Sequence, residues 1–499
     1  MAKDVEKGSQ PPVAVRERDN DTDSSSPSPH PSPIDPRNEK TDSTSTTGTD
    51  TDTDTDHEDH DDITHPPPQA ESIISRTISR VMTRQSTNYD PGPPPDGGVK
   101  AWTAVFCAHL VITNTWGIIN SFGVFQPYYT TALSRPPSDI SWIGSVQIFL
   151  LFFIGALTGR LTDAGFFRHI FALGTVLLLL GTFTVSVATT YTQVFLSQGI
   201  CMGLGMGCLF CPSISTVSTY FNKRRAIALA VAACGSATGG LVFPSMVREL
   251  LPKVGFGWTM RSIGFIQIVT LGVGCVFLKP RIKPRKSGPL IDLAAWREGE
   301  YVFYAFGAFT CFIGLYFPFY YVASFSKDII GLEFTDSLNL LLVMNGVGII
   351  GRLVPNAIAD RVGPLKVFVP VAGLCGVCVI CWMAVKDVGG LYAWSCFYGM
   401  VAGGIQSLFP AGLSSLNTDV RKAGVRIGMV FTTVSFATLA GPPIAGAIIT
   451  VCNGDYWGAQ VFAGVTLLIG MGLIATSFVI KSRKMMAETG ATSMWSVKV

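Results

Sequence analysis

The sequence predicts an all-α membrane protein of twelve transmembrane helices, arranged as two bundles of six. Hydrophobic residues make up 48% of its 499 residues and charged residues only 14%, whereas soluble domains carry about 25% charged residues. From Ile170 to Asn222 the chain contains no Asp, Glu, Lys or Arg. About 20 such residues suffice for a helix to cross a bilayer. A hairpin motif that occurs twice indicates that the two halves are related.

Residues 1–98 differ from the rest in composition. They are polar and rich in Ser, Thr, Pro and Asp, with a Thr-Asp repeat from Thr49 to Asp56. They hold too little apolar surface to offset the entropy of ordering the chain, so we expect a disordered cytosolic tail. The net charge of +3 averages this acidic tail and basic loops. It therefore gives no indication of nucleic-acid binding.

Twelve apolar spans follow the tail. Six lie within a first bundle over 99–279, at 101–125, 139–159, 169–189, 193–218, 226–248 and 262–279. A basic connector, 280–299, is expected in the cytosol. Six more lie within a second bundle over 300–481, at 301–323, 336–357, 366–385, 388–413, 426–450 and 457–480. Residues 482–499 form a second cytosolic tail.

The distribution of Lys and Arg predicts the orientation. With the N-terminus in the cytosol, the inner connections hold about twenty of these residues and the outer ones about six. The sequence therefore predicts that both termini are cytosolic.

The cysteines and the motif content indicate neither a metal site nor an enzyme. All cysteines except Cys452 fall inside the spans, so they form no disulfide framework. Cys208-x-x-Cys211 lies in an apolar helix without His or carboxylate neighbours, which favours small packing residues over metal ligands. No phosphate-binding Gly-x4-Gly-Lys-Ser/Thr loop or nucleophile constellation occurs. We therefore expect no cofactor.

The repeated hairpin closes the second span and the eighth. The first copy runs from Gly155 to Arg168 and the second from Gly351 to Lys366; Asp163 in the first corresponds to Asp360 in the second. We expect Gly159 to allow a close helix crossing and Asp163 to accept hydrogen bonds from the N-terminal end of a neighbouring helix. Arg168 and Arg361 are positioned to pair with such carboxylates.

Three stretches resemble the major facilitator superfamily and, within it, the fungal branch of the monocarboxylate porter family. They are Pro95-Asp96-Gly97-Gly98, the run from Tyr220 to Gly240, and Gly351-Arg352 with Asp360-Arg361-x-Gly363. The likeness covers about 95–481, although Val99 stands where an aromatic residue usually follows the first motif. It implies the major facilitator fold, with two bundles that rock about a midplane site.

The resemblance also implies residue roles. The hairpin residues Gly159, Asp163, Arg168, Asp360 and Arg361 would form a conformational latch, with topogenic charge as the alternative. Arg352 would hold a substrate carboxylate or act in gating; the alternative is that it snorkels to the surface. Related proton-coupled transporters carry an acid one turn before this arginine and a lysine in span one. Here those places hold Gly348 and Asn120, which argues against proton symport of lactate-like acids.

Further candidates for substrate binding or gating are polar residues within the spans. His109 could relay protons or simply pack by hydrogen bonding, so coupling to protons stays open. Asn120, Asn345 and Gln406 are expected to face the central path. Aromatic residues, Phe312 and Tyr316 among them, crowd span seven. Amides, aromatic rings and one arginine suit a larger, partly apolar organic anion.

We therefore expect a transporter of a small organic solute, an organic anion, that works by alternating access. One alternative is efflux of a secondary metabolite from a fungal biosynthetic cluster, and another is a nutrient sensor that binds without transport. The expected partners are a small-molecule substrate and the lipid bilayer. The plasma membrane is the expected location, and the vacuolar membrane is the alternative.

Overall fold

The computed structural model describes residues 94–221, 224–281, 292–416, 420–490 and 493. For residues 163, 225–226, 334–335 and 420–424 it describes the backbone alone. These residues form helices and, within the described ranges, no strands. Most of the predicted N-terminal tail, and half of the basic connector, lie outside the described residues.

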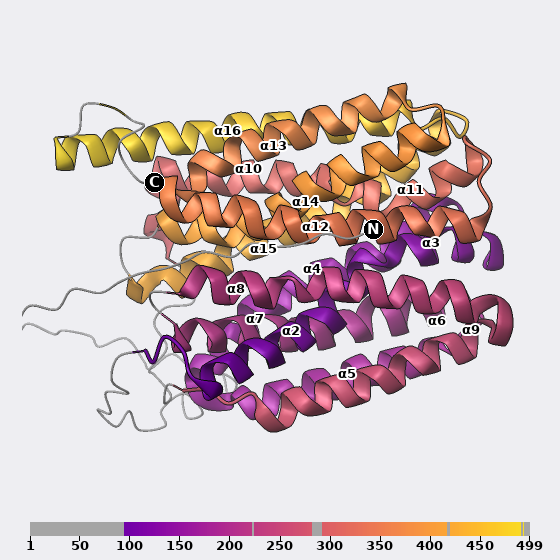
Figure 1. Ribbon diagram of the computed structural model, residues 1–499, viewed down its shortest axis with the longest axis horizontal. Coiled ribbons are helices and arrows are strands. Elements are labelled where there is room, and N and C mark those ends of the chain that lie inside the picture. The colour runs from indigo at the N-terminus through magenta and orange to yellow at the C-terminus, as the bar shows by residue number, and fades with distance from the viewer. Residues whose placement is uncertain (1–93, 222–223, 282–291, 417–419, 491–492, 494–499) are drawn as a thin grey trace, which may run out of the picture. The chain divides into compact units, whose positions relative to one another are not determined.

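The first half of the chain contains eight α-helices and two π-helical segments in the described residues. Their bounds are α2 (Val99–Asn120), α3 (Phe122–Ala132), α4 (Pro137–Leu161), η1 (Thr162–Phe166), α5 (Phe167–Val185), α6 (Tyr191–Val194), η2 (Phe195–Met202), α7 (Gly203–Tyr220), α8 (Arg225–Ala233) and α9 (Gly235–Phe277). In Figure 1 these helices, indigo to magenta, gather below those of the second half.

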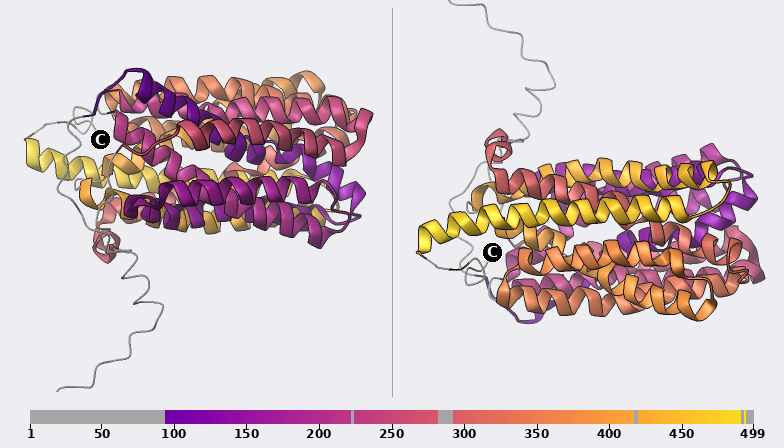
Figure 2. Two further views of the ribbon diagram at one scale, coloured as in Figure 1. Left: turned by 90° about the horizontal axis from the view of Figure 1, so that it is seen from below. Right: turned by 90° about the horizontal axis from the view of Figure 1, so that it is seen from above.

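The second half begins with a short 3₁₀ segment before its long helices. Its elements are η3 (Leu293–Arg297), α10 (Gly299–Leu315), α11 (Phe317–Asp328), α12 (Phe334–Val362), α13 (Pro364–Cys381), η4 (Trp382–Ala384), α14 (Val388–Leu416), α15 (Val420–Val451) and α16 (Trp457–Thr489). In Figure 2 the first half is in front when viewed from below, and the second half when viewed from above. The helix α16 continues beyond the predicted end of the last span at 480.

Ten helices in the described residues are long and apolar enough to cross a membrane. One of them, Ile227–Phe277, covers two of the predicted spans. The chain is not helical at Gly255, where φ is 75°, so this segment consists of two helices. The 29-residue α14 is not among the ten, since its glycines and polar aromatic residues lower its hydropathy. Both predicted spans in Ile227–Phe277, and the span in α14, are therefore present as helices.

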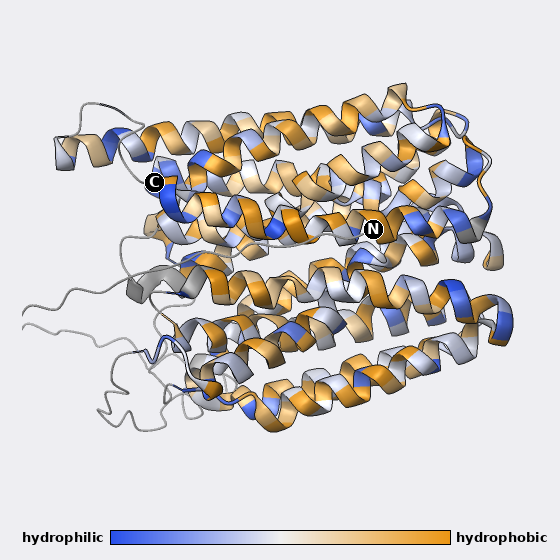
Figure 3. Ribbon diagram, viewed as in Figure 1, coloured by the Kyte–Doolittle hydropathy of each residue, from blue (hydrophilic) through white to orange (hydrophobic). Residues whose placement is uncertain are grey.

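The outward surface of the helices is apolar. Val269 and Phe397 are 66% and 63% exposed, and such side chains would be buried in a soluble protein. Figure 3 shows hydrophobic residues along the helices and hydrophilic ones concentrated near their ends. Lipid is the environment that suits this surface, because helices satisfy their backbone hydrogen bonds internally.

Two helices break at corresponding places in the two halves. The first span bends between α2 and α3 at Ser121, with φ −91° and ψ 0°. The seventh bends between α10 and α11 at Tyr316, with φ −91° and ψ −10°. Pro318 follows this second break, where its missing N–H is tolerated at the start of α11. In duplicated transporters, interrupted helices in matching positions of both halves mark the binding site.

Close packing inside each half depends on glycine. A Cβ atom at Gly117 of α2 would lie 2.5 Å from the Cα of Gly239 in α9, and one at Gly403 of α14 would lie 2.6 Å from the carbonyl oxygen of Gly348 in α12. Between the halves, α4 packs on α15 and α9 on α12. The centre of the molecule is therefore enclosed by helices from both halves.

Candidate substrate site

Arg352 is buried deep inside α12. It lies ten residues before the last residue of that helix, Val362, which is about 15 Å along the axis at about 1.5 Å per residue. Only 2% of its surface is exposed. The side chain therefore does not snorkel to the surface, which was the alternative interpretation of this arginine.

The guanidinium of Arg352 has one side-chain partner. Its Nη2 donates to the Oε1 of Gln406 in α14 at 2.7 Å. Its Nη1 is buried without a hydrogen-bond partner, and no carboxylate pairs with Arg352 in the described part of the chain. A Cβ atom at Gly348 would lie 2.7 Å from Nη1, so this glycine leaves room for the guanidinium. A buried cation without a counter-ion is costly and usually functional.

Other buried polar groups near the two helix breaks also lack partners. Asn120, directly before the first break, is fully buried, and neither its amide oxygen nor its amide nitrogen has a partner among the described residues. Tyr316, at the second break, has a buried hydroxyl without a partner and lies within electrostatic reach of Arg352. The Nε2 of Gln406 is likewise unpartnered. Buried polar atoms are nearly always hydrogen-bonded, so this group of atoms fits a polar ligand.

Aromatic rings from both halves adjoin these polar groups. Trp116 of α2 lies 6.2 Å from Tyr316 between ring centroids, with 23° between the planes. Trp116 also packs against Phe152 and Phe210, at 5.3 and 5.5 Å. On the second half, Phe312 and Tyr316 continue the cluster, which also includes Phe409 and Phe431.

Sequence reasoning included Phe312 and Tyr316 among the aromatic residues of span seven, but it missed Trp116. The signal was present, because Trp116 lies four residues before Asn120 and so shares its helix face. It also missed Phe152, Phe210, Phe409 and Phe431. Phe210 and Phe409 stand at matching places in the two halves, in Leu209-Phe210 and Leu408-Phe409. Nothing in the local sequence distinguishes Phe152 and Phe431 from lipid-facing phenylalanines.

Of the two remaining predicted binding residues, Asn345 lies on the same helix as Arg352. Asn345 lies two turns before Arg352 on α12, and its Nδ2 donates to the backbone oxygen of Leu341 at 2.9 Å. Its side chain contacts Gly240 of α9, so it joins the two halves. The Oδ1 of Asn345 is buried without a partner.

His109 lies apart from this group. Its Nδ1 is 2.9 Å from the carbonyl oxygen of Val231 and its Nε2 is 3.1 Å from the hydroxyl of Thr238. Because a carbonyl can only accept, Nδ1 carries the proton. Both ring nitrogens therefore lie at the contact of α2 with α8 and α9.

The structure describes the predicted latch only in part. Both hairpins turn at a glycine with a left-handed φ, 96° at Gly165 and 106° at Gly363. The prediction of a close helix crossing at Gly159 is wrong. Apart from the backbone of its own helix, no described heavy atom lies within 4 Å of a Cβ atom built there. The close contact is one turn earlier, at Gly155, where a Cβ atom would lie 2.8 Å from the sulfur of Cys211.

The charged latch residues whose side chains the structure describes lie at the surface. The side chain of Asp163 lies outside the described residues. Arg168, Asp360 and Arg361 are exposed. Arg168 lines a surface cavity of about 300 Å³ that also includes Lys279.

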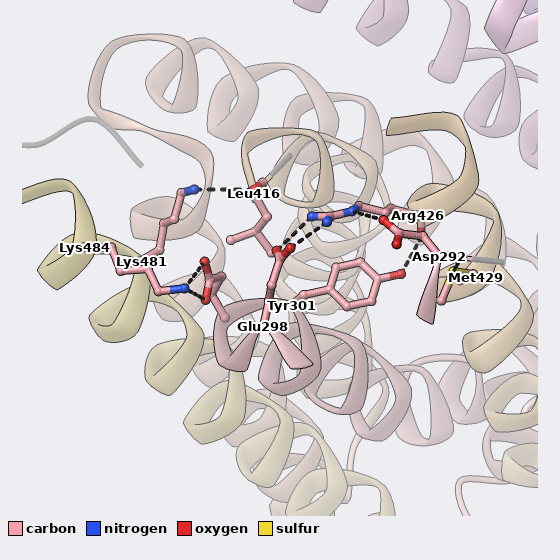
Figure 4. Close-up of polar contacts among 9 residues, drawn as sticks. Asp292, Glu298, Tyr301, Leu416, Arg426, Met429, Lys481 and Lys484 are labelled. Atoms are coloured by element: carbon pink, nitrogen blue, oxygen red, sulfur yellow. Dashed lines mark hydrogen bonds and ion pairs between the residues drawn. The ribbon is translucent and has the colours of Figure 1, made fainter. Parts of the chain in front are cut away.

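A second buried arginine has its charge fully matched. Arg426, near the start of α15, donates from Nε to Asp292 at 3.1 Å, and from Nη1 and Nη2 to Glu298 at 2.8 and 2.6 Å. The hydroxyl of Tyr301 donates to the backbone oxygen of Arg426 at 2.7 Å, and Lys484 of α16 pairs with Glu300 at 2.6 Å. Figure 4 shows this network, which we call the Arg426 cluster.

No metal or disulfide chemistry accompanies either arginine. All twelve cysteines are free thiols. Within the described residues, no group of three or more His, Cys, Asp or Glu side chains is placed to hold a metal ion.

Comparison with known proteins identifies the family to which this chain belongs. The model of the Major Facilitator Superfamily matches residues 101–442. An MFS-type transporter of Gibberella zeae is 50% identical over 407 residues, which cover 81% of this chain and 92% of that relative. The agnestins efflux protein AgnL12 of Paecilomyces divaricatus is 34% identical over 81% of this chain and 91% of its own length. The aspyridones efflux protein apdF of Emericella nidulans is 33% identical over 77% and 78%. The chain therefore belongs to the major facilitator superfamily and is a multi-pass transporter of a small molecule.

Proposed function

We propose that this transporter exports an organic anion, a secondary metabolite, and that Arg352 binds its negative charge. The observation that carries the proposal is the buried guanidinium of Arg352, with Nη1 unpartnered and no carboxylate beside it in the described residues. An anionic substrate would supply the missing charge and hydrogen-bond acceptor. Gln406 holds the opposite side of the guanidinium, which orients Nη1 for that role.

The direction of transport rests on the relatives. Two of them are named efflux proteins for particular metabolites. Membership of the monocarboxylate porter family, proposed from the sequence motifs, agrees with an acidic substrate. The latch of Asp163, Arg168, Asp360 and Arg361 stays part of the proposal as the element that holds one access state.

Coupling to protons would require a titratable group near Arg352. A carboxylate at position 348 or a lysine at 120 would offer a titratable group, but the chain has Gly348 and Asn120. We therefore propose uniport or anion exchange, in which flux does not follow a proton gradient. We also propose the plasma membrane as the location, with both termini cytosolic; fluorescence microscopy of a tagged chain distinguishes this from the vacuolar membrane.

Counterflow in proteoliposomes tests the proposal with a panel of labelled aromatic and aliphatic carboxylates. We expect wild-type flux of at least one anion and at least a tenfold loss in Arg352→Gln, while Arg352→Lys, which keeps the charge, retains part of it. Arg483→Gln, an exposed arginine on α16, is the control and should transport normally. Full activity of Arg352→Gln would refute the role of Arg352, and flux that follows an imposed pH gradient would refute the uncoupled mechanism.

A further inference from the structure

The aromatic cluster spans the boundary between the two halves. Trp116 belongs to α2 of the first half, and Tyr316 is the residue at which the seventh span breaks in the second half. Their rings are nearly parallel, at 23°, and their centroids are 6.2 Å apart. Alternating access moves one half against the other, and these two rings lie on opposite sides of that boundary.

The two rings have both polar and apolar neighbours. Tyr316 lies within electrostatic reach of Arg352, and its own hydroxyl is buried without a partner. The phenyl rings of the cluster also pack on one another, Phe152 on Phe431 at 5.2 Å and Phe312 on Phe409 at 4.8 Å. A ligand between Trp116 and Tyr316 would therefore meet a cation, a hydroxyl and phenyl rings.

We propose that Trp116 and Tyr316 form a clamp that stacks on both faces of a planar aromatic ring in the transported anion, whose acidic group faces Arg352. This rests on the proposed function, and it narrows the substrate class from organic anions to aromatic acids. Stacked carbon atoms lie about 3.5 Å apart, so an inserted ring needs about 7 Å between the clamp planes. The spacing between the planes cannot exceed the 6.2 Å between the ring centroids, so the clamp is closed in this structure and the halves must separate to open it.

Some side chains in and around the aromatic cluster keep a small exposed fraction. Trp116 and Phe431 each retain 8% exposure, and Phe210, Cys234 and Gln406 are only partly buried. Tyr320 and Asn120 are fully buried. The aromatic cluster is therefore not completely enclosed by protein atoms.

A matched pair of probes tests the clamp. 2-Naphthoate is planar and aromatic, whereas decahydro-2-naphthoate has the same carbon skeleton and charge without the flat ring system. We expect wild-type protein in nanodiscs to bind 2-naphthoate more tightly in equilibrium dialysis. Trp116→Leu should weaken 2-naphthoate binding by about tenfold and change binding of the saturated acid by less than about twofold, because stacking is the interaction removed. Trp116→Phe should restore most of the preference.

Trp394 supplies the matched control. It stacks on Tyr398 at 5.2 Å and 11° and on Trp382 at 4.4 Å and 20°, and its Nε1 donates to the backbone oxygen of Cys378. All of these residues belong to the second half, so Trp394→Leu removes aromatic stacking without touching the clamp. It should leave the ratio of the two affinities unchanged. If Trp116→Leu fails to fold, Tyr316→Leu provides the same comparison.

The outcomes separate the clamp from the anion site. A wild-type protein that does not prefer 2-naphthoate, or an unchanged affinity ratio in folded Trp116→Leu, overturns the clamp. Arg352→Gln should weaken both acids equally. If it weakens neither, the proposed anion site fails, whereas loss of both with an unchanged ratio in Trp116→Leu leaves the anion site standing and removes only the clamp.

Discussion

Two arginines of the second half are buried to a similar degree and treated differently by their surroundings. Arg426 is 6% exposed and Arg352 is 2% exposed. Arg426 makes three hydrogen bonds to two carboxylates, and its guanidinium lies 5.8 Å from the ring centroid of Tyr301. Arg352 makes one hydrogen bond, to a neutral amide. The charge of Arg426 is thus balanced by carboxylates of the protein, whereas Arg352 keeps a hydrogen-bond donor, Nη1, for a ligand.

The difference teaches how a structural charge can be distinguished from a functional one. Asp292 and Glu298 belong to the end of the connector between the halves, so the Arg426 cluster attaches that connector to the start of α15. Arg352 is instead held within reach of both halves. Three predictions test this contrast, from the largest expected effect to the smallest.

The largest effect is expected from removing each arginine in turn. Arg426→Met should destabilise the protein by roughly 3–5 kcal/mol, because it leaves two carboxylates buried or half-buried without their partner. Arg352→Met should cost no stability, since it removes a buried charge that has no counter-ion in the described residues. Thermal unfolding in the same detergent compares the two variants.

Charge exchange is the control for Arg426. Glu298→Arg combined with Arg426→Glu should recover part of the lost stability, with a coupling of about 0.5–3 kcal/mol. Equal destabilisation by Arg426→Met and Arg352→Met would contradict the contrast.

An intermediate effect is expected from giving Arg352 the partner that Arg426 has. Gly348→Asp puts a carboxylate one helical turn before Arg352, on the same face. We expect anion flux to fall by about tenfold, because the new pair competes with the substrate for the guanidinium. Counterflow of the best transported anion measures this.

Crowding must be separated from charge in that experiment. The Cβ atom of any residue at 348 would lie 2.7 Å from Nη1, so the guanidinium must shift in every variant. Gly348→Asn has the same size as Gly348→Asp without its charge. The prediction fails if the two variants transport equally.

The smallest effect is expected at the edge of the Arg426 cluster. Tyr301→Phe removes one hydroxyl that donates to the backbone of Arg426 at 2.7 Å and leaves all three carboxylate contacts in place. A loss of about 1 kcal/mol in unfolding free energy is expected for such a hydrogen bond. If thermal unfolding instead shows a loss as large as that of Arg426→Met, the carboxylates are not the main groups that stabilise the buried guanidinium of Arg426.

Much of the fold could be predicted from sequence because its signals are local. Hydropathy gave the spans, and helices occupy all twelve regions, including the two spans that Gly255 separates and the span in α14. The hairpin turns were also visible, and Gly165 and Gly363 take the left-handed conformation that glycine permits. The close crossing was assigned to Gly159 instead of Gly155, because small residues recur every turn and spacing does not say which one meets a neighbour.

The candidate site was predicted less completely. Arg352 was singled out because a charge within an apolar span is conspicuous. Arg426 was counted with the loop charges, since it lies at the edge of its span, and its burial against Asp292 and Glu298 was not foreseen. Those partners are more than 120 residues away along the chain.

The sequence by itself determined the membrane class, the spans, their duplication and the one arginine deep within them. These follow from composition and periodicity, which act over one helix at a time. Only the tertiary structure decided that Arg352 meets Gln406, that His109 is occupied by packing, and that Trp116 faces Tyr316. The physical reason is that such contacts depend on how each helix is rotated and how closely its neighbour approaches. Pairs of close contacts such as Gly117 with Gly239 set both quantities, and they connect residues that no local pattern links.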